Sequence, residues 1–340
     1  MNFLLSIIVI SHNQREKLRR CLESILAMHL SFPYEIIVSD DRSMDGTREM
    51  LETEYANRVV ITYCNSDEGH CTNNSQRSGY NRCNAYPLAQ GKYIAHVDAD
   101  DYFRPHATVY EKQVLALEAH PECALAMSTC VCVQEGEQLE NGRIWHFPRT
   151  IRDGEVLDSH DFIRGDWFRI NQCFMQRRNQ NVSPVVLYGK RYVDSVITYH
   201  HLQFGKVVHV DACDYVYVQH SSSVVGKLSM QSKDSVILWC LGLYIPLLIP
   251  SQTKDFFFGC YFSSIKRVIQ MALNNYQLQE ENYNSLSDLH VWIYDCFARK
   301  LMKKDIFRLK FTLFCMQIMH RIGWQPSLAV YLLRTLLYKK

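Results

Sequence analysis

Apolar residues follow two kinds of pattern along the N-terminal part of the chain. Apolar-rich runs at residues 7–10, 34–39, 59–63 and 93–97 predict strands, and the continuous β-branched run at 7–10 predicts a strand buried on both faces. Between these runs, apolar residues recur every three or four positions, which predicts helices with one buried face. The helices are expected over residues 15–28, behind a turn-rich loop at 40–47, near 77–89 and near 107–119. Alternating strands and helices predict an α/β domain with a Rossmann-like, mostly parallel sheet, which binds ligands beyond the carboxyl ends of its strands.

Past residue 120 the pattern is less regular. Residues 124–133 are expected to form one strand that completes the sheet. Gly136, Asn141 and Gly142 indicate a surface hairpin loop after it. A further strand is expected at residues 215–218.

Aspartates gather where two of the predicted strands end. Asp40 and Asp41 follow the second strand, and Asp98, Asp100 and Asp101 follow the fourth. Because parallel strands end at one edge, we expect both groups on the same rim. Clustered negative charge there is unfavourable unless a cation neutralises it, and carboxylate oxygens suit Mg²⁺ or Mn²⁺. A polar turn is the alternative for either group alone, but their convergence favours a metal site.

Composition limits the class of protein. A chain of 340 residues with 47% apolar residues supports one large domain with an appendage, or two domains. Its 37 Lys and Arg nearly balance its 35 Asp and Glu, so bulk charge does not indicate nucleic-acid binding. The 13 cysteines are odd in number and lack a Cys-x-x-Cys pair, so we expect reduced thiols in the cytoplasm rather than a disulfide framework. No basic segment precedes the N-terminal apolar run, so no secretory signal is expected.

Glycine-rich phosphate loops are absent from the sequence. Neither Gly-x-Gly-x-x-Gly after the first strand nor Gly-x-x-x-x-Gly-Lys-Ser occurs. The phosphates of a nucleotide ligand would then need another partner. A divalent ion on the aspartates would bridge a diphosphate and assist its departure.

Four segments give a more specific signal. Residues 7–13 form an apolar strand followed by Ser-His-Asn, and residues 40–47 read Asp-Asp-Arg-Ser-Met-Asp-Gly-Thr. Residues 82–84 read Arg-Cys-Asn, and residues 91–101 end in Asp-Ala-Asp-Asp. In this order, over about 100 residues, the segments resemble motifs of the inverting glycosyltransferases of family 2, which have the GT-A fold.

The resemblance implies a role for each motif. It implies that Asp40 or Asp41 contacts the nucleobase, that Asp98 binds the ribose and the metal, and that Asp100 binds the metal directly. It also places in the nucleotide-sugar site Ser11, Asn13, Arg82 and Asn84. Uridine is the commonest base in the family, and a carboxylate accepts a hydrogen bond from its imide N–H, as it would from guanine or thymine.

Two residues depart from the family's motifs. Arg42 stands where a glycine is usual, and His12 stands where a tyrosine is usual. We expect Arg42 to point to solvent rather than to a phosphate, because exposed arginines are common. His12 is left without a role.

Later segments also resemble the family's motifs. Residues 192–200 and 205–210 resemble its Glu-Asp-led helix and the Gly-Lys strand that follows, although Val193 replaces the glutamate. An inverting transfer needs a base that deprotonates the acceptor hydroxyl, and Asp194 is the candidate. An N-cap of the helix is the alternative role for Asp194. Weaker candidates for the base are Asp161 and Asp166.

The segment Gln219-His220-Ser221-Ser222-Ser223 resembles the family's His-x-x-Ser loop. By that resemblance His220 is a candidate metal or phosphate ligand. A neutral imidazole is a reasonable ligand for Mn²⁺. A surface histidine without a ligand role is the alternative.

The C-terminal part differs in character, so we expect a GT-A domain over residues 1–228 and a helical region over residues 229–340. Residues 236–250 carry no charge but are too short for a membrane span. Residues 299–340 hold ten Lys and Arg against one Asp, a net charge of +9. A basic stripe on the apolar helix near 303–321 favours an anionic membrane surface as a partner. Packing within the helical region, or at a dimer interface, is the alternative.

The sequence therefore predicts an inverting, metal-dependent glycosyltransferase. We expect a nucleotide-diphosphate sugar, with UDP as the nucleotide, as donor, Mn²⁺ or Mg²⁺ as cofactor, and a glycan acceptor linked to polyprenyl diphosphate. Its place is expected in bacterial surface polysaccharide synthesis, in the cytoplasm at the inner face of the cell membrane. The alternative is a non-catalytic, sugar-nucleotide-binding scaffold subunit. A nucleotidyltransferase is disfavoured by the missing phosphate loop. A homo-oligomer is compatible with the sequence.

Overall fold

The computed structural model describes residues 3–68, 74–145, 147, 150–158, 173–179, 201–202 and 204–220, which belong to an N-terminal unit, Met1–Gly226. The predicted helical region over 229–340, with its basic tail, lies outside the described residues. So do the candidate bases Asp161, Asp166 and Asp194. These expectations stay predictions.

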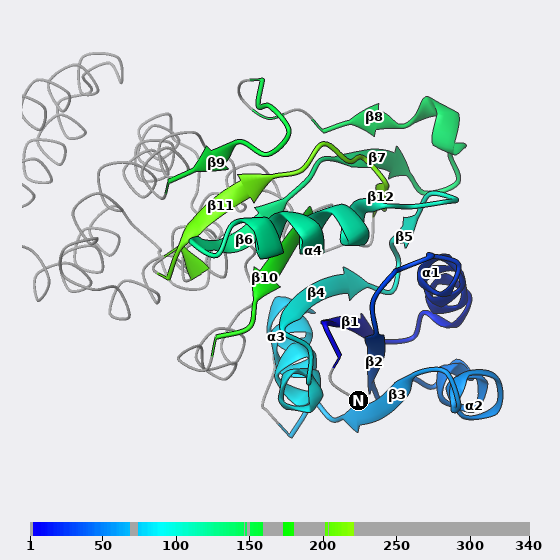
Figure 1. Ribbon diagram of the computed structural model, residues 1–340. Helices are drawn as coiled ribbons and strands as arrows, with labels where there is room; N and C mark the ends of the chain where they lie inside the picture. Colours follow the sequence, from blue (N-terminus) through cyan, green and yellow to red (C-terminus); the bar gives the residue numbers. More distant parts are fainter. Residues whose placement is uncertain are drawn as a thin grey trace, which may run out of the picture. The chain divides into compact units, whose positions relative to one another are not determined.

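An eight-stranded sheet in the order β3-β2-β1-β4-β10-β6-β11-β9 forms the framework (Figure 1). Strands β3, β2, β1 and β4 run parallel to one another. They span Leu5–Ser11 (β1), Tyr34–Asp41 (β2), Val60–Cys64 (β3) and Tyr93–Asp98 (β4). Strand β1 lies between two neighbours and is buried along its whole length, as its β-branched sequence predicts.

Helices cover both faces of this sheet. They are α1 (Arg15–Leu26), α2 (Thr47–Met50), α3 (Asn74–Ala85) and α4 (Val109–Ala119), with a π-helical turn at Leu51–Tyr55 and 3₁₀ turns at Tyr86–Leu88 and Leu139–Asn141. Side chains of α1, α2 and α4 pack with Ile7 and Val9 in the main core, whereas Ala85 and Tyr86 pack with Ile8 and Ile10 on the other face. The alternation of neighbouring β1 residues between two cores confirms the doubly wound arrangement.

The predicted single strand over residues 124–133 is wrong, because the chain breaks there into β6 (Cys123–Met127) and β7 (Cys130–Gln134). Between them, Ser128 N–H donates to the Cys173 carbonyl at 3.0 Å and Thr129 N–H donates to the Ala212 carbonyl at 3.1 Å. The two amides thus bond to separate segments, so no single ladder can continue. Strand β7 leaves the eight-stranded sheet.

Strands β11 (Lys206–His209) and β12 (Tyr215–Gln219) divide in the same way. Strand β11 pairs with β6 in the large sheet, and β12 pairs with β7 in a four-stranded sheet of order β5-β12-β7-β8. The other two strands of this sheet are β5 (Tyr102–Phe103) and β8 (Arg143–Ile144). The antiparallel pairing of β7 with β8 confirms the predicted hairpin.

Besides the short β5, the strands that were not predicted include β9 (Val156–Leu157) and β10 (Phe174–Arg177). Strand β10 is antiparallel to both β4 and β6 and lies between them. Its four residues include Gln176 and Arg177, so local sequence gives little strand signal, and its neighbours on both sides stabilise it.

No helix in the described part of the chain is long and apolar enough to cross a membrane. The cysteines in this part are free thiols.

Candidate active site

The two aspartate groups meet at the carboxyl ends of β1, β2 and β4, as predicted. In the strand register, Ser11 of β1 lies beside Asp40 of β2, and Ile10 of β1 lies beside Asp98 of β4. Strand β1 therefore brings carboxylates nearly 60 residues apart to either side of its own end. This edge is the candidate site.

Asp40 and Asp41 use their carboxylates differently. Both Asp40 oxygens accept hydrogen bonds from Ser43, one from its amide at 3.0 Å and one from its hydroxyl at 2.5 Å. Asp41 accepts the Ser66 N–H at 3.0 Å on Oδ1, while Oδ2 is buried and has no partner in the described part of the chain. Burial raises the pKa of Asp40, although the bonds from Ser43 oppose that shift. Of the two predicted base contacts, Asp41 has the unused oxygen.

Ser11 and Asn13 lie beside this pair. Ser11 is 3% exposed, and its hydroxyl has no partner among the described residues. Asn13 adopts a left-handed backbone with φ of 52°, accepts the Met44 N–H at 2.7 Å through its side chain and donates its own N–H to Ser43 Oγ at 2.7 Å. Asparagine tolerates this conformation better than most residues. The two hydrogen bonds of Asn13 therefore connect the loop after β1 to the loop after β2.

Arg42 is half exposed, as predicted, but its guanidinium is bound. It donates to Asn65 Oδ1 at 2.6 Å and pairs with Asp67 at 2.9 Å. Arg77 pairs with the other oxygen of Asp67 at 2.7 Å. The backbone of Arg42 has φ of 51°, which gives a physical reason for the glycine that is usual in the motif. The unassigned His12 contacts the Asp41 carbonyl through Nδ1 at 2.5 Å.

Arg82 and Asn84 both come from α3. The Arg82 side chain is fully buried and donates to Asp98 Oδ1 at 2.5 Å. The Asn84 amide donates to the hydroxyls of Ser39 and Thr62, each at 3.0 Å, and so packs α3 against β2 and β3. The structure thus brings Arg82 to the carboxylates, whereas the described contacts of Asn84 are internal. The proposed nucleotide contact of Asn84 stays a prediction.

Asp100 meets His220, which lies 120 residues away in the sequence. His220 Nε2 is 2.6 Å from Asp100 Oδ2. Burial raises the pKa of Asp100, and the negative charge of Asp98 raises it further, while the contact with His220 opposes both effects. Two of the three predicted metal ligands are therefore in contact, and the third is near enough to act on the charge of Asp100.

Asp101 has a different environment. It is 1% exposed and accepts hydrogen bonds from the Tyr215 hydroxyl and from the Val218 N–H. Helix α1 supports the same segment, since Arg20 donates to the Asp100 carbonyl at 2.8 Å. Sequence reasoning missed Arg20, Ser66 and Tyr215 because their contacts are long-range and no local pattern announces them.

The donor atoms at this edge suit a hard or borderline cation, since they are carboxylate oxygens with one imidazole nitrogen. In the residues that the structure describes, no group of three His, Cys, Asp or Glu side chains is already drawn together around one ion position. Arg82 and His220 instead hold the carboxylates of Asp98 and Asp100. The residues fit a divalent cation in their chemistry, and burial together with the negative charge of Asp98 raises the pKa of Asp100, which a cation would oppose.

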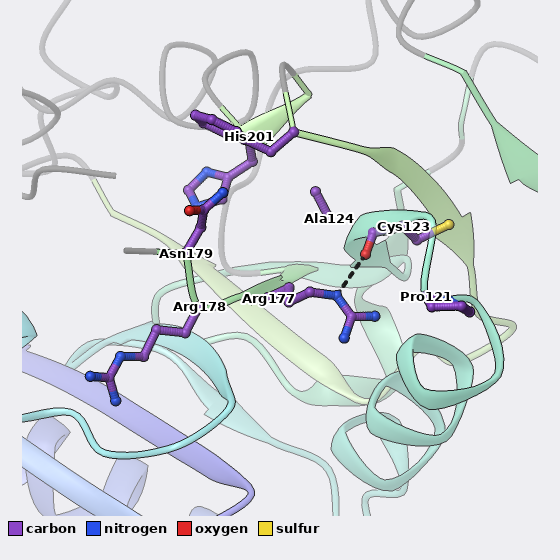
Figure 2. A pocket seen from close by; sticks show the side chains of 8 residues that line it. Pro121, Cys123, Ala124, Arg177, Arg178, Asn179 and His201 are labelled. Carbon is purple, nitrogen blue, oxygen red and sulfur yellow. Dashed lines mark hydrogen bonds between the residues drawn. The ribbon is translucent and has the colours of Figure 1, made fainter. Parts of the chain in front are cut away.

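A pocket of about 310 Å³ lies at the opposite edge of the sheet (Figure 2). Arg177 lines it and donates to the Cys123 carbonyl at 3.0 Å. Arg177 pairs in register with Tyr93, the first residue of β4, so this edge is the amino end of the parallel strands. The pocket is therefore separate from the aspartates.

Several curated relatives of the chain are named as glycosyltransferases. It is 28% identical over 158 residues to the putative teichuronic acid biosynthesis glycosyltransferase TuaG of Bacillus subtilis, covering 45% of this chain and 57% of the relative. It is 31% identical over 100 residues to the UDP-Glc:alpha-D-GlcNAc-diphosphoundecaprenol beta-1,3-glucosyltransferase WfaP of Escherichia coli, covering 29% of this chain and 36% of the relative. The matched segments span between 16% and 57% of the length of the curated relatives.

A solved structure shares the fold. The S. aureus TarS fragment crystallised with UDP-GlcNAc superposes with a TM-score of 0.63 at 14% identity, covering 99% of this chain and 93% of that chain. The model of the family described as glycosyl transferase family 2 matches residues 6–181, half of the chain. The protein therefore belongs to glycosyl transferase family 2, which confirms the family, the glycosyltransferase class and the GT-A type of α/β fold predicted from its sequence.

Proposed function

We propose that the protein is an inverting, metal-dependent glycosyltransferase that moves a sugar from a UDP-sugar to a glycan acceptor. The observation that supports this most directly is the grouping of Asp98, Asp100 and His220 at one sheet edge with the half-satisfied carboxylate of Asp41. A base-binding carboxylate and a metal-binding group on one rim suit a nucleoside diphosphate, which needs both.

Asp41 is the proposed contact for the nucleobase. Its Oδ2 lacks a donor in the described part of the chain, and its Oδ1 is fixed by Ser66 N–H at 3.0 Å. A buried acceptor without a donor is costly, so a ligand N–H that bonds to it gains the difference. The imide N–H of uracil is such a donor. Asp40 instead shapes the loop, because both of its oxygens are held by Ser43.

Asp98, Asp100 and His220 are the proposed ligands of a divalent cation, with Mn²⁺ favoured by the imidazole. When bound, the cation supplies Lewis-acid stabilisation to the departing nucleotide diphosphate. Arg82 stays buried beside Asp98 and holds that carboxylate in place at 2.5 Å. Arg82 would thus keep Asp98 in place to hold the ribose and the metal.

Asp194 is the proposed base that removes the proton from the acceptor hydroxyl as it attacks the anomeric carbon. This assignment rests on the resemblance of residues 192–200 to the family's motif and lies outside the described residues. Exchange of Asp194 for Asn removes the base without changing the size of the side chain.

The proposed acceptor is a polyprenyl-diphosphate-linked glycan of a bacterial surface polysaccharide. The names of TuaG and WfaP, which describe a teichuronic acid pathway and a diphosphoundecaprenol acceptor, support this choice. An acceptor of this kind lies in a membrane, and the net charge of +9 over residues 299–340 supports attachment to its anionic inner face.

A panel of UDP-sugars with Mn²⁺, read out by release of UDP in the presence of lipid-linked acceptors, tests the activity. We expect one donor to be used, Asp194→Asn to abolish transfer while UDP binding persists, and a chelator to stop the reaction. Protein that binds UDP-sugar but transfers nothing from any donor would favour the scaffold alternative instead. Liposome co-sedimentation with and without residues 299–340 tests attachment, and equal pelleting of both proteins contradicts it.

A further inference from the structure

The last aspartate of the Asp98–Asp101 segment is turned toward β12. Its Oδ2 accepts the hydroxyl proton of Tyr215, and its Oδ1 accepts the Val218 N–H at 2.8 Å. Asp101 and Tyr215 are each 1% exposed. Both oxygens of Asp101 are therefore used inside the protein.

These two bonds fix β12 at both ends of a short stretch. Tyr215 begins the strand and pairs in register with Phe103 of β5, and the two rings pack edge to face at 5.2 Å. Val218 is two residues before His220, which contacts Asp100 at 2.6 Å. A carboxylate that binds the strand at these two residues fixes the register of β12 against β5. It therefore also fixes the position of His220, which directly follows the strand.

Helix α1 holds the other side of the segment through its backbone. Arg20 donates to the Asp100 carbonyl at 2.8 Å, and the Cys21 thiol lies 3.8 Å from the Asp98 carbonyl. These contacts place the two aspartates without touching β12. The position of His220 therefore depends on the bonds from Asp101 to β12, whereas the positions of Asp98 and Asp100 are also set by α1.

We propose that Asp101 and Tyr215 are positioning residues that deliver His220 to the metal held by Asp98 and Asp100. The inference rests on the proposed function, because it assumes a divalent cation at this edge. Groups that hold a metal ligand in place commonly set metal affinity without contacting the ion.

The test measures Mn²⁺ affinity by calorimetry on the full chain with UDP bound, and thermal unfolding of the metal-free protein. Asp101→Ala is expected to lower Mn²⁺ affinity about 10- to 100-fold, and Asp101→Asn, which keeps an acceptor for Val218 N–H, to recover most of it. Tyr215→Phe removes one hydrogen bond and is expected to cost about fivefold. In a His220→Ala background, Asp101→Ala and Tyr215→Phe should cause no further loss of affinity.

Tyr110→Phe is the matched control. Tyr110 also packs on Phe103, at 5.1 Å, and is 1% exposed, but its hydroxyl has no partner among the described residues. Its removal should leave Mn²⁺ affinity unchanged.

Three outcomes would overturn the inference. One is unchanged Mn²⁺ affinity in the Asp101→Ala protein or, if that variant does not fold, in the Tyr215→Phe protein. Another is an equal loss with and without His220, which would mean that Asp101 acts through the other aspartates. The third is a complete absence of Mn²⁺ binding by the unaltered protein with UDP, which would remove the proposed function as well. The first two leave the proposed function intact.

Discussion

The amino and carboxyl ends of the parallel strands handle their buried polar groups in opposite ways. At the amino end, Glu35 is 6% exposed and accepts the Ser6 hydroxyl at 2.6 Å and the Gln90 N–H at 2.7 Å. Gly91 N–H donates to Ser6 Oγ at 2.8 Å. Only glycine fits there, since a Cβ on residue 91 would lie 2.5 Å from the Ser6 nitrogen. These buried polar groups are therefore bonded to one another and to nearby backbone amides.

Arg177 completes the amino end. Its guanidinium donates to the carbonyls of Leu117 at 2.6 Å, His120 at 3.3 Å and Cys123 at 3.0 Å, and to the Tyr93 hydroxyl at 3.2 Å. The first two carbonyls lie at the C-terminus of α4, where a positive charge is favourable. Figure 2 shows the arginine extended toward Cys123 rather than across the pocket. This charge stabilises the fold.

At the carboxyl end, partners are incomplete. Asp41 Oδ2 and the Ser11 hydroxyl have none in the described part of the chain, and burial and Asp98 together raise the pKa of Asp100. A native protein keeps such costs where a ligand relieves them. The contrast supports the proposal that the chain itself satisfies the buried polar groups at the amino end, whereas a bound ligand satisfies those at the carboxyl end.

Replacing Arg82 at the carboxyl end and Arg177 at the amino end should show the largest difference between the two ends of the strands. Arg82→Met leaves Asp98 without its buried partner and is expected to lower the free energy of unfolding by about 3 to 5 kcal/mol and to weaken binding of UDP with Mn²⁺. Arg177→Met should lower stability but leave that binding unchanged. Chemical denaturation and calorimetry measure both quantities. Weakened ligand binding by the Arg177→Met protein would contradict the contrast.

Replacing one carboxylate at each end of the strands should show that only the carboxyl end contributes to catalysis. Asp100→Asn is expected to lower kcat/KM for sugar transfer by about 10²- to 10³-fold, because charge stabilisation of the leaving group is lost. Glu35→Gln, at the other end, should leave kcat/KM unchanged. Steady-state kinetics measure kcat/KM for both variants. A similar loss of kcat/KM in both would mean that the carboxyl end has no particular role in catalysis.

A smaller effect should distinguish the adjacent aspartates. Asp41→Asn is expected to weaken UDP binding by about 1 to 3 kcal/mol, since the ligand loses a buried acceptor. Asp40→Asn should have the smaller effect on UDP binding, because Ser43 already occupies both Asp40 oxygens. Calorimetric titration with UDP gives both affinities. The reverse order would assign the base contact to Asp40.

The smallest effect concerns pH. Because the pKa of Asp100 is raised in the folded protein, the folded state binds more protons than the unfolded state as pH rises from the ordinary aspartate pKa of 3.8 to the raised value. The metal-free protein should lose stability over that window. Asp100→Asn should remove this loss and raise the melting temperature at neutral pH but not below the ordinary pKa. A lower melting temperature at neutral pH would show that the contact with His220 outweighs burial.

Sequence patterns determined the parts of the molecule in which neighbours along the chain act together. Apolar runs predicted β1 to β4, helical spacing predicted the helices on both faces, and the position of Asp40 and Asp98 after two parallel strands predicted their meeting. Each of these follows from a local period or from a strand end, which a single segment already specifies.

Tertiary structure alone decided which side chains work together. Residues 124–133 divide into β6 and β7 because separate segments bond to the amides between them. Asp100 meets His220 across 120 residues, and Asp101 bonds to Tyr215 across 114. Neighbouring aspartates look alike in a sequence. Their roles differ because register and strand breaks, set by contacts distant in the chain, turn one toward the site and the next toward β12.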